Sequence, residues 1–390
     1  MTKPLIYMNN AATSWPKPPE VLEAVADCVR NPVFEAGRGS GIKSADYVAE
    51  AREDVSRFLG AEDSENIIFT SNATDSLNIL ISGFINARKG CVPHVLTTEL
   101  DHNSVLRPLH EFERENKIGL GVVPFEKDNC RVSVDAVEAA VQKDTKLMVM
   151  THASNVLGSV QNLKEIGDLL HEHGIFFIAD GAQTAGHVNI NLKSLPVDAF
   201  VFTGHKGLLG ISGTGGFYLR DADKIEPTRF GGTGTNSVSL SQPREMPERF
   251  EAGTHNYPGL AALSAGIKFI EREGLKKLEA QTVSQTNFII REFAKQDNIT
   301  VHNKYPDVPV ISFNISGVDN DDVGFILSKV YNIVSRTGLH CAPLVHKKID
   351  GGVGSVRLSL SCFTTDGECE TTANAVCEVA ENAHTKVCSA

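Results

Sequence analysis

The sequence lacks the features that mark membrane proteins, nucleic-acid-binding proteins and secreted proteins. No apolar run in its 390 residues approaches the roughly 20 residues that a transmembrane helix needs. Lys and Arg number 37 against 48 Asp and Glu, and the formal net charge is −11, which disfavours a nucleic-acid partner. The first residues, MTKPLIYMNN, contain no apolar signal-peptide core, so we expect a cytoplasmic protein with no membrane contact.

Cysteine is sparse, and its spacing is unlike that of a disulfide framework. The eight cysteines stand at positions 28, 91, 130, 341, 362, 369, 377 and 388, and no two form Cys-x-x-Cys. In a reducing compartment most of them are expected to be free thiols that pack as small apolar residues. Cys341 differs in its setting, because in SRTGLHCAPLVH it follows a histidine between a glycine-containing turn and a proline. A zinc site built from His340, Cys341 and His346 is disfavoured, since no second ligand pair at zinc-like spacing accompanies them.

The middle of the chain alternates short apolar runs with helix-like segments. KLMVMTHASN, GIFFIADGAQ and VDAFVFTGHKG have the composition of buried strands, and LKEIGDLLHEHG between the first two has apolar residues at helical spacing. This β-α-β order predicts an α/β fold with a parallel sheet covered by helices.

A different pattern begins near residue 260. Residues 260–296 are predicted to form a long helix broken near Gly274, and strand-like runs with one intervening helix follow. An α+β pattern of this kind predicts a second, smaller domain. The expected division is an N-terminal segment, residues 1–15, that packs with the small domain, a large domain over 16–260, and a small domain over 261–390.

Polar side chains gather where the three predicted strands end. Ligands of open α/β sheets bind beyond the carboxyl ends of the strands, and the residues there are Asn155, Asp180, Gln183, Thr203, His205 and Lys206. A lysine that forms a Schiff base and an aspartate that pairs with a pyridinium nitrogen are what pyridoxal phosphate requires. The alternative for Lys206 alone is a surface lysine on a turn, and the accompanying set favours the cofactor.

A phosphate site is predicted where IIFTSNATDSLN passes from a strand into a helix. The backbone N–H groups and the positive dipole end of a helix N-terminus attract anions, and Thr74 adds a hydroxyl donor. An ordinary helix cap explains the same residues equally well. No nucleotide-binding glycine motif is present. His102 in TTELDHNSV is predicted either to stack on a pyridoxal ring or to cap the helix that follows.

Nine motifs occur together and in a fixed order. They are MNNAATSWPKPPEV, FTSNATDSLN, LDHNS, ASNVLGSVQ, ADGAQTAGH, FTGHKGLLG, RFEAGTHNYPG, RTGLHCAP and VRLSLS. From Tyr7 to about Phe363 the chain resembles the class V aminotransferase branch of the fold-type I pyridoxal-phosphate enzymes. Within that branch it most resembles the Suf-type cysteine desulfurases and selenocysteine lyases, which carry an R-T-G-x-H-C-A segment. The resemblance implies a mainly parallel seven-stranded sheet between helices, with a smaller α+β C-terminal domain.

The resemblance also implies a role for each matching residue. Lys206 would bond the cofactor, Asp180 would pair with its ring nitrogen, and His102 would stack on the ring. Gln183 would contact the ring hydroxyl. The phosphate would be held by Ala73, Thr74, Thr203, His205 and, from the neighbouring subunit of a homodimer with shared active sites, Thr254. The substrate side of the pocket would be formed by Asn10, Asn155, Arg336 and Arg357, with Cys341 as the sulfur acceptor.

The activity implied by the resemblance is conversion of L-cysteine to L-alanine, with the sulfur held as a persulfide on Cys341. That sulfur would serve the biosynthesis of iron–sulfur clusters or other sulfur-containing cofactors, through a possible sulfur-acceptor protein. Selenocysteine lyase and C–S β-lyase activity are the alternatives. A non-catalytic cofactor-binding protein is disfavoured, because Lys206, Asp180 and His102 are all present. His340 and His102 are both candidates for the group that deprotonates Cys341.

Three positions depart from the family pattern. Asn72 stands where glycine is frequent, Ile211 and Ser212 stand where Pro-Gln is common, and His255 follows EAGT where proline is usual. These departures concern the shape of the pocket and the preferred substrate. The short spacing of RTGLHC predicts a constrained Cys341 loop that keeps the persulfide near the active site.

Overall fold

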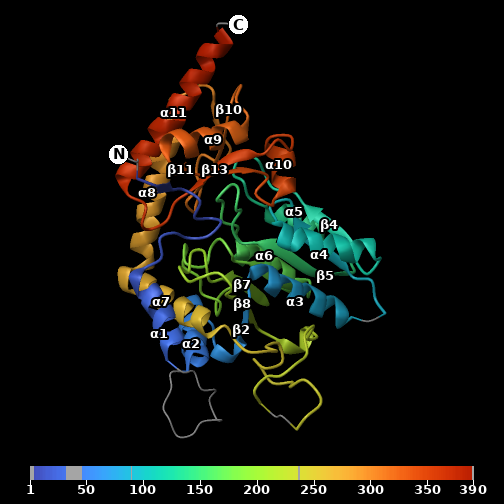
Figure 1. Ribbon diagram of the computed structural model, residues 1–390. Helices are drawn as coiled ribbons and strands as arrows, with labels where there is room; N and C mark the ends of the chain where they lie inside the picture. The colour runs from blue at the N-terminus through green and yellow to red at the C-terminus, as the bar shows by residue number, and fades with distance from the viewer. Residues whose placement is uncertain (1–3, 32–45, 89, 236–237, 389–390) are drawn as a thin grey trace.

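A seven-stranded sheet forms the centre of the larger domain in this computed structural model (Figure 1). The structure describes residues 4–31, 46–88, 90–235 and 238–388. The strand order is β2 (Ile67–Thr70), β8 (Gly215–Leu219), β7 (Ala199–Thr203), β6 (Phe176–Asp180), β5 (Thr145–Thr151), β3 (His94–Thr98) and β4 (Gly119–Val123). β8 runs antiparallel to both of its neighbours, and the pairs from β7 to β4 are parallel. The predicted α/β fold with a mainly parallel sheet is therefore confirmed.

Helices cover both faces of this sheet. One face packs against α2 (Tyr47–Leu59), α5 (Val134–Ala140), α6 (Leu163–Glu172) and α7 (Tyr257–Glu273), and the other against α3 (Ala73–Asn86) and α4 (Asn103–Arg114). Neighbouring strand residues alternate between the two cores: Phe177 packs in the first and Phe176 in the second. α1 (Pro19–Arg30) packs on α7. Two 3₁₀ turns, η1 (Ser64–Asn66) and η2 (Ala222–Lys224), complete the domain.

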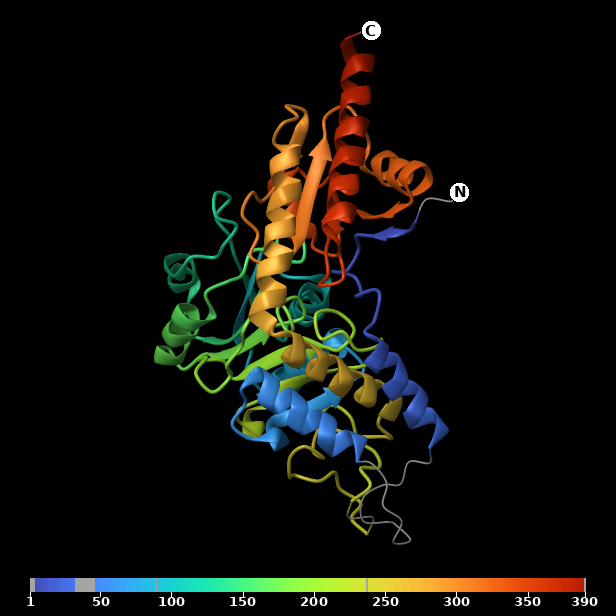
Figure 2. The ribbon, with the colours of Figure 1, turned by 90° about the vertical axis from the view of Figure 1, so that its left-hand side faces the viewer.

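The smaller domain is built on an antiparallel sheet in the order β12 (Arg336–Gly338), β13 (Ser355–Ser359), β10 (Val310–Ile315) and β9 (Ile299–Val301). It carries α8 (Leu275–Phe293), α9 (Asn320–Tyr331), α10 (Pro343–Ile349) and α11 (Asp366–Cys388). Figure 2 shows α8 and α11 side by side, and both contribute to one core with β10 and β13.

The predicted long helix breaks at Gly274, whose φ of 89° is favourable only for glycine. Before the break, α7 packs against α1 and α2; after it, α8 packs against α11. We therefore propose that the two domains divide at Gly274 rather than near residue 260. Residues 1–3 of the predicted N-terminal segment, residues 32–45 of the predicted large domain and residues 389–390 of the predicted small domain lie outside the described residues.

The N-terminal segment runs from one domain to the other. β1 (Ile6–Tyr7) pairs in parallel with β11 (Ile333–Val334), and Asn9 bridges to Ser359. The same segment then reaches the turn after β7, where the carbonyl of His205 accepts bonds from Ser14 N at 3.0 Å and Lys17 Nζ at 3.1 Å. This segment thus links the small-domain sheet to the turn that carries Lys206.

Candidate active site

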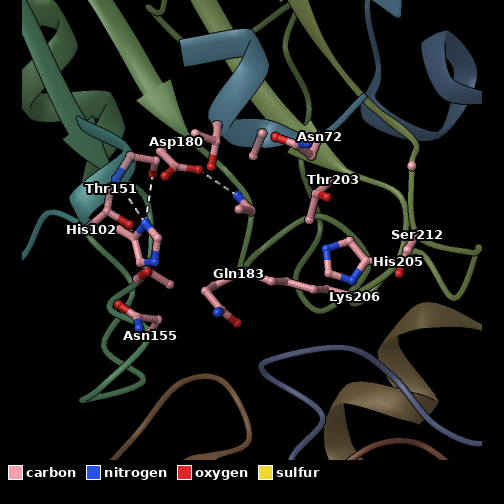
Figure 3. Close-up of a pocket in the computed structure, with 16 residues that line it drawn as sticks. Asn72, His102, Thr151, Asn155, Asp180, Gln183, Thr203, His205, Lys206 and Ser212 are labelled. Carbon is pink, nitrogen blue, oxygen red and sulfur yellow. Dashed lines mark hydrogen bonds between the residues drawn. The ribbon is translucent and has the colours of Figure 1, made fainter. Parts of the chain in front are cut away.

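A cavity of about 550 Å³ opens at the carboxyl ends of β5, β6 and β7, beside the N-termini of α3 and α4 (Figure 3). Nine predicted site residues line it: Ala73, Thr74, His102, Asn155, Asp180, Gln183, Thr203, His205 and Lys206. The lining also includes Asn72 and Ser212, two of the family departures, and five polar or small residues that sequence reasoning did not assign, Ser104, Thr151, Ala153, Ala182 and Gly213. Ser104 stands in the first turn of α4 and Thr151 ends β5, so their places were readable from the element ends.

Lys206 follows β7 on a tight turn and extends into the cavity (Figure 3). Burial lowers the pKa of its ammonium to about 8, and the nearby Asp180 carboxylate opposes this shift. A substantial fraction of this lysine is therefore the neutral, nucleophilic amine near neutral pH.

Asp180 ends β6 and is almost fully buried in the wall of the cavity. Its Oδ1 accepts the Ala182 N–H at 3.0 Å, and burial raises the pKa of the carboxyl group while Lys206 lowers it. Gly181 follows directly, and a Cβ at that position would lie 2.0 Å from the Phe200 ring, so the sequence Asp-Gly is required by packing. The cavity thus has an anionic group fixed where a cationic ring nitrogen would be stabilised.

The N-terminus of α3 provides donors for an anion. Asn72 caps the helix by accepting the Asp75 N–H at 3.0 Å, and the N–H groups of Ala73 and Thr74 have no carbonyl of their own helix to bond. Gly215 on β8 permits this approach, because a Cβ there would lie 2.6 Å from the Asn72 Cα. Buried His205 Nδ1 lacks a partner among the described residues. These groups fit a phosphate, whose oxygens would satisfy them.

His102 caps the helix that follows it, which is one of its two predicted roles, and stacking on a pyridoxal ring stays a prediction. It caps α4, because its Nδ1 accepts the Ser104 N–H at 3.1 Å, and its ring also lines the cavity (Figure 3). Burial, followed by the charge of Lys206, lowers the pKa of His102 to about 4. The neutral ring therefore carries its proton on Nε2, which suits an uncharged stacking partner.

Asp101 is a residue of the site that sequence reasoning missed. It is fully buried, and its carboxylate accepts Thr98 N at 2.7 Å and Thr151 N at 2.6 Å, which ties the end of β3 to the end of β5. Burial raises the pKa of this carboxyl to about 7. Its signal in the sequence was an acidic residue directly before His102, in the loop between a strand and the helix that follows.

Cys341 lies beside the cavity on a strained turn rather than among its lining residues. His340 and Cys341 have φ values of 50° and 59°, a left-handed conformation that costs a non-glycine residue about 1–3 kcal/mol. Two bonds to the large domain hold the turn: the His340 carbonyl accepts Asn155 Nδ2 at 2.7 Å, and the Cys341 carbonyl accepts Asn103 N at 2.7 Å. Arg336 Nη2 lies 4.0 Å from the Cys341 Sγ, so a thiolate there faces a guanidinium.

Neither histidine suggested as a base for Cys341 suits that task. Burial, followed by the charge of Arg357, lowers the pKa of His340 to about 2, and that of His102 is about 4. Both rings are neutral and weakly basic near pH 7, so proton transfer to them from a thiol is unfavourable. The charged side chain that faces the Cys341 sulfur is instead Arg336.

Arg357 is a buried cation behind Asn155. Its Nη1 donates to the Asn155 carbonyl at 2.9 Å, its Nη2 lies 3.3 Å from Asn9 Oδ1, and its Nε has no partner. Burial and the nearby Arg336 lower its pKa to about 9. Among the residues that the structure describes, no carboxylate pairs with Arg357, which fits a guanidinium that awaits an anionic ligand.

Two other predicted residues lie away from the main cavity. Asn10 lines a small cavity behind Lys206, where its Nδ2 donates to the Ser359 carbonyl at 2.9 Å and its Oδ1 accepts from Trp15 N at 3.0 Å. Thr254 is exposed and lines a separate cavity of about 600 Å³ with His255. Within one chain the structure therefore does not bring Thr254 to Lys206.

The departure at His255 is explained by its surroundings. His255 Nε2 lies 2.8 Å from Glu251 Oε2, and Glu251 is also paired in a bidentate manner with buried Arg52 at 2.8 and 2.9 Å. This network holds the start of the EAGT segment against β2, since Glu251 also accepts the Phe69 N–H.

Across the described ranges, no helix is long and apolar enough to cross a membrane, and no cluster of three metal-ligating side chains occurs.

Comparison with known proteins gives consistent results. A family model described as Aminotransferase class-V matches residues 6–371. A probable cysteine desulfurase of Halalkalibacterium halodurans is 33% identical over 354 residues, which cover 89% of this chain and 86% of that protein. A cysteine desulfurase of Salmonella agona is 31% identical over 94% of this chain and 91% of its own. The apo structure of a cysteine desulfurase from Thermococcus onnurineus superposes with a TM-score of 0.89 at 32% identity and covers 97% of this chain and 95% of that one.

Proposed function

Because the chain belongs to the class V aminotransferase family, we propose that it is a cysteine desulfurase that converts L-cysteine to L-alanine and takes the sulfur onto Cys341 as a persulfide. The observation that carries this proposal is the placing of Cys341: its turn is held by Asn155 and Asn103 beside the cavity that contains Lys206. The relatives named cysteine desulfurase support it.

Enzymes of this family use pyridoxal 5′-phosphate, and the cavity fits that cofactor. Lys206 would hold it through a Schiff base, Asp180 would face its ring nitrogen, and His102 would cover the ring. Gln183 and Thr203 line the same wall, beside the donors of the α3 N-terminus. When bound, this cofactor accepts electron density from the Cα of the substrate.

The protein's own side chains would carry out the remaining steps. Arg357 and Asn155 would bind the substrate carboxylate, and the Lys206 amine would accept the Cα proton. Cys341 Sγ would then form a bond to the substrate sulfur while the substrate Cβ–S bond breaks. The electron pair of that bond stays with the three-carbon fragment, which takes up protons and leaves as alanine.

The products distinguish this activity from its alternatives. The purified protein is incubated with L-cysteine, and alanine, pyruvate and sulfide are measured with and without reductant, with L-selenocysteine as a parallel substrate. We expect alanine in excess of pyruvate, and sulfide release that depends on the reductant. Pyruvate as the main product would instead establish a β-lyase, and turnover of selenocysteine alone would establish a selenocysteine lyase.

Cofactor uptake is expected to depend on pH through Lys206. Schiff-base formation needs the neutral amine, and because burial lowers the pKa of Lys206 to about 8, the neutral fraction rises as pH increases through that value. The rate at which apoprotein binds added pyridoxal phosphate, followed by absorbance, should therefore increase about 15-fold from about pH 6.5 to 8 and level off above about pH 9. A rate still rising tenfold per pH unit above pH 9 would contradict this pKa.

A homodimer is the proposed assembly, with Thr254 reaching the phosphate site of the partner. Thr254 is exposed and lies outside its own chain's main cavity, in the wall of a separate one. Sedimentation equilibrium should give twice the 42.1 kDa of one chain, and Thr254→Ala should lose cofactor faster during dialysis than wild type. A monomer with full cofactor retention would contradict the proposal.

The physiological role belongs to the same proposal. A persulfide on Cys341 would supply sulfur for iron–sulfur clusters or other sulfur-containing cofactors, through an acceptor protein in the cytoplasm. Support comes from the half-buried position of Cys341, next to the exposed Leu339, where a partner thiol has access. Transfer of labelled sulfur from the protein to candidate acceptors tests this role.

A further inference from the structure

Three polar side chains form a buried row directly behind Cys341. His340 and His346 are 3% and 0% exposed, and their ring centroids lie 5.4 Å apart. His346 Nδ1 lies 2.6 Å from Asp350 Oδ2, and His340 Nε2 lies 3.3 Å from the hydroxyl of Ser355. None of these contacts reaches the cavity, so the cofactor site does not account for them.

The hydrogen-bonding directions in this row follow from the chemistry of its ends. A carboxylate only accepts, so His346 donates from Nδ1 to Asp350, and a neutral His346 then has its lone pair on Nε2. The Ser355 hydroxyl can donate or accept, and where it donates to His340 Nε2 the proton of neutral His340 is on Nδ1. His340 Nδ1 and His346 Nε2 are the two buried ring atoms of the pair without a partner among the described residues.

In that arrangement the two unpartnered atoms complement each other, because one is a donor and the other an acceptor on adjacent rings. Leaving both unsatisfied in the interior is costly, and a small ring rotation or one bridging water would satisfy them together. The row would then run without a break from Asp350 through His346 and His340 to Ser355.

We propose that this Asp350–His346–His340 row positions Cys341, with His346 and Asp350 as positioning residues that hold the left-handed turn from behind. His340 is fixed at two points: its ring belongs to the row, and its backbone carbonyl accepts a hydrogen bond from Asn155. The Gly352 N–H also bonds the His346 carbonyl at 2.9 Å, which anchors the loop after Asp350 to the same helix. The functional part of this inference rests on the proposed desulfurase activity.

The test compares Asp350→Asn and His346→Phe with wild type, and uses Lys347→Ala on the exposed side of α10 as the matched control. Alkylation of Cys341 by iodoacetamide is followed in the holoprotein by mass spectrometry of its peptide. Release of the turn should expose the thiol and accelerate alkylation by about 5- to 30-fold in the first two variants, the factor expected for losing one or two buried hydrogen bonds. Lys347→Ala should match wild type.

A second readout separates positioning from a general loss of structure. Asp350→Asn keeps the shape of the side chain, and its thermal midpoint is measured beside its kinetics. Its kcat for alanine formation should fall. Its affinity for L-cysteine should stay the same, measured in a Cys341→Ser background as the L-cysteine concentration that gives half of the spectral change. Unchanged alkylation in both variants, or weakened cysteine binding in step with kcat, would overturn the proposal. If wild type makes no alanine, the proposed function fails, and the alkylation rates still decide whether the row holds the turn.

Discussion

Lys206→Ala is expected to abolish the yellow colour of the protein and its alanine formation together. The amine is the only group on the turn after β7 that can bond the cofactor aldehyde, and its depressed pKa of about 8 keeps part of it neutral for that purpose. The same amine is the proposed acceptor of the Cα proton, so two functions are lost at once. We expect the rate of alanine formation to fall by about 10³-fold or more.

The control for this variant is Lys193→Ala, which removes an exposed lysine of the same domain. It should keep the absorbance and the rate of wild type. Circular dichroism and the thermal midpoint of the apoproteins establish that Lys206→Ala is folded. An alanine rate within tenfold of wild type in folded Lys206→Ala would refute the role of this lysine.

Cys341→Ser should stop sulfur transfer and leave substrate binding intact. A serine hydroxyl stays protonated and does not attack sulfur, whereas a cysteine sulfur is a nucleophile, and the Sγ of Cys341 lies 4.0 Å from the Arg336 guanidinium. Alanine formation without added thiols should fall by about 10²-fold or more, while the absorbance change on adding L-cysteine persists. The measurement is alanine release in a single turnover, with persulfide detected by the mass of the Cys341 peptide.

Cys91→Ser provides the matched control, because Cys91 is also a free thiol and is exposed. It should behave as wild type in both assays. Alanine formation that survives undiminished in Cys341→Ser would rule out the persulfide mechanism and favour release of sulfur without the thiol, whereas pyruvate in place of alanine would point to β-lyase chemistry.

The sheet and its cofactor rim were predictable because they are encoded locally. Each buried strand appears as a short apolar run, and the residue that ends it, such as Asp180 after β6 or Lys206 after β7, must fall on the same edge of a parallel sheet. The family motifs then added positions such as Arg357, which local pattern alone would not have distinguished from any other arginine.

Other features depend on contacts between distant segments, and no local pattern encodes them. Residues 260–296 have a helical pattern throughout, so only the packing of α7 on α1 and of α8 on α11 shows that the break at Gly274 separates two cores. The hydrogen bond from Asn155 to His340 joins positions 185 residues apart. His340 and His102 were candidates for the base that deprotonates Cys341. Burial and the nearby guanidinium groups lower the pKa of both, so both are weak bases.

The pairing of β1 with β11 also has a consequence for the order in which the chain acquires its structure. Ile6 pairs with Ile333, and Asn9 bridges to Ser359. The first strand to be synthesised therefore cannot pair until residues near the end of the chain have been made. During translation the large sheet has all of its strands once residue 219 has emerged, long before this pairing is possible. Closure of so long a loop is entropically costly and slow. The link from the small domain to the Lys206 turn therefore cannot be complete before residue 359 has emerged, so a nascent chain has all strands of the large sheet before it can have a finished active site.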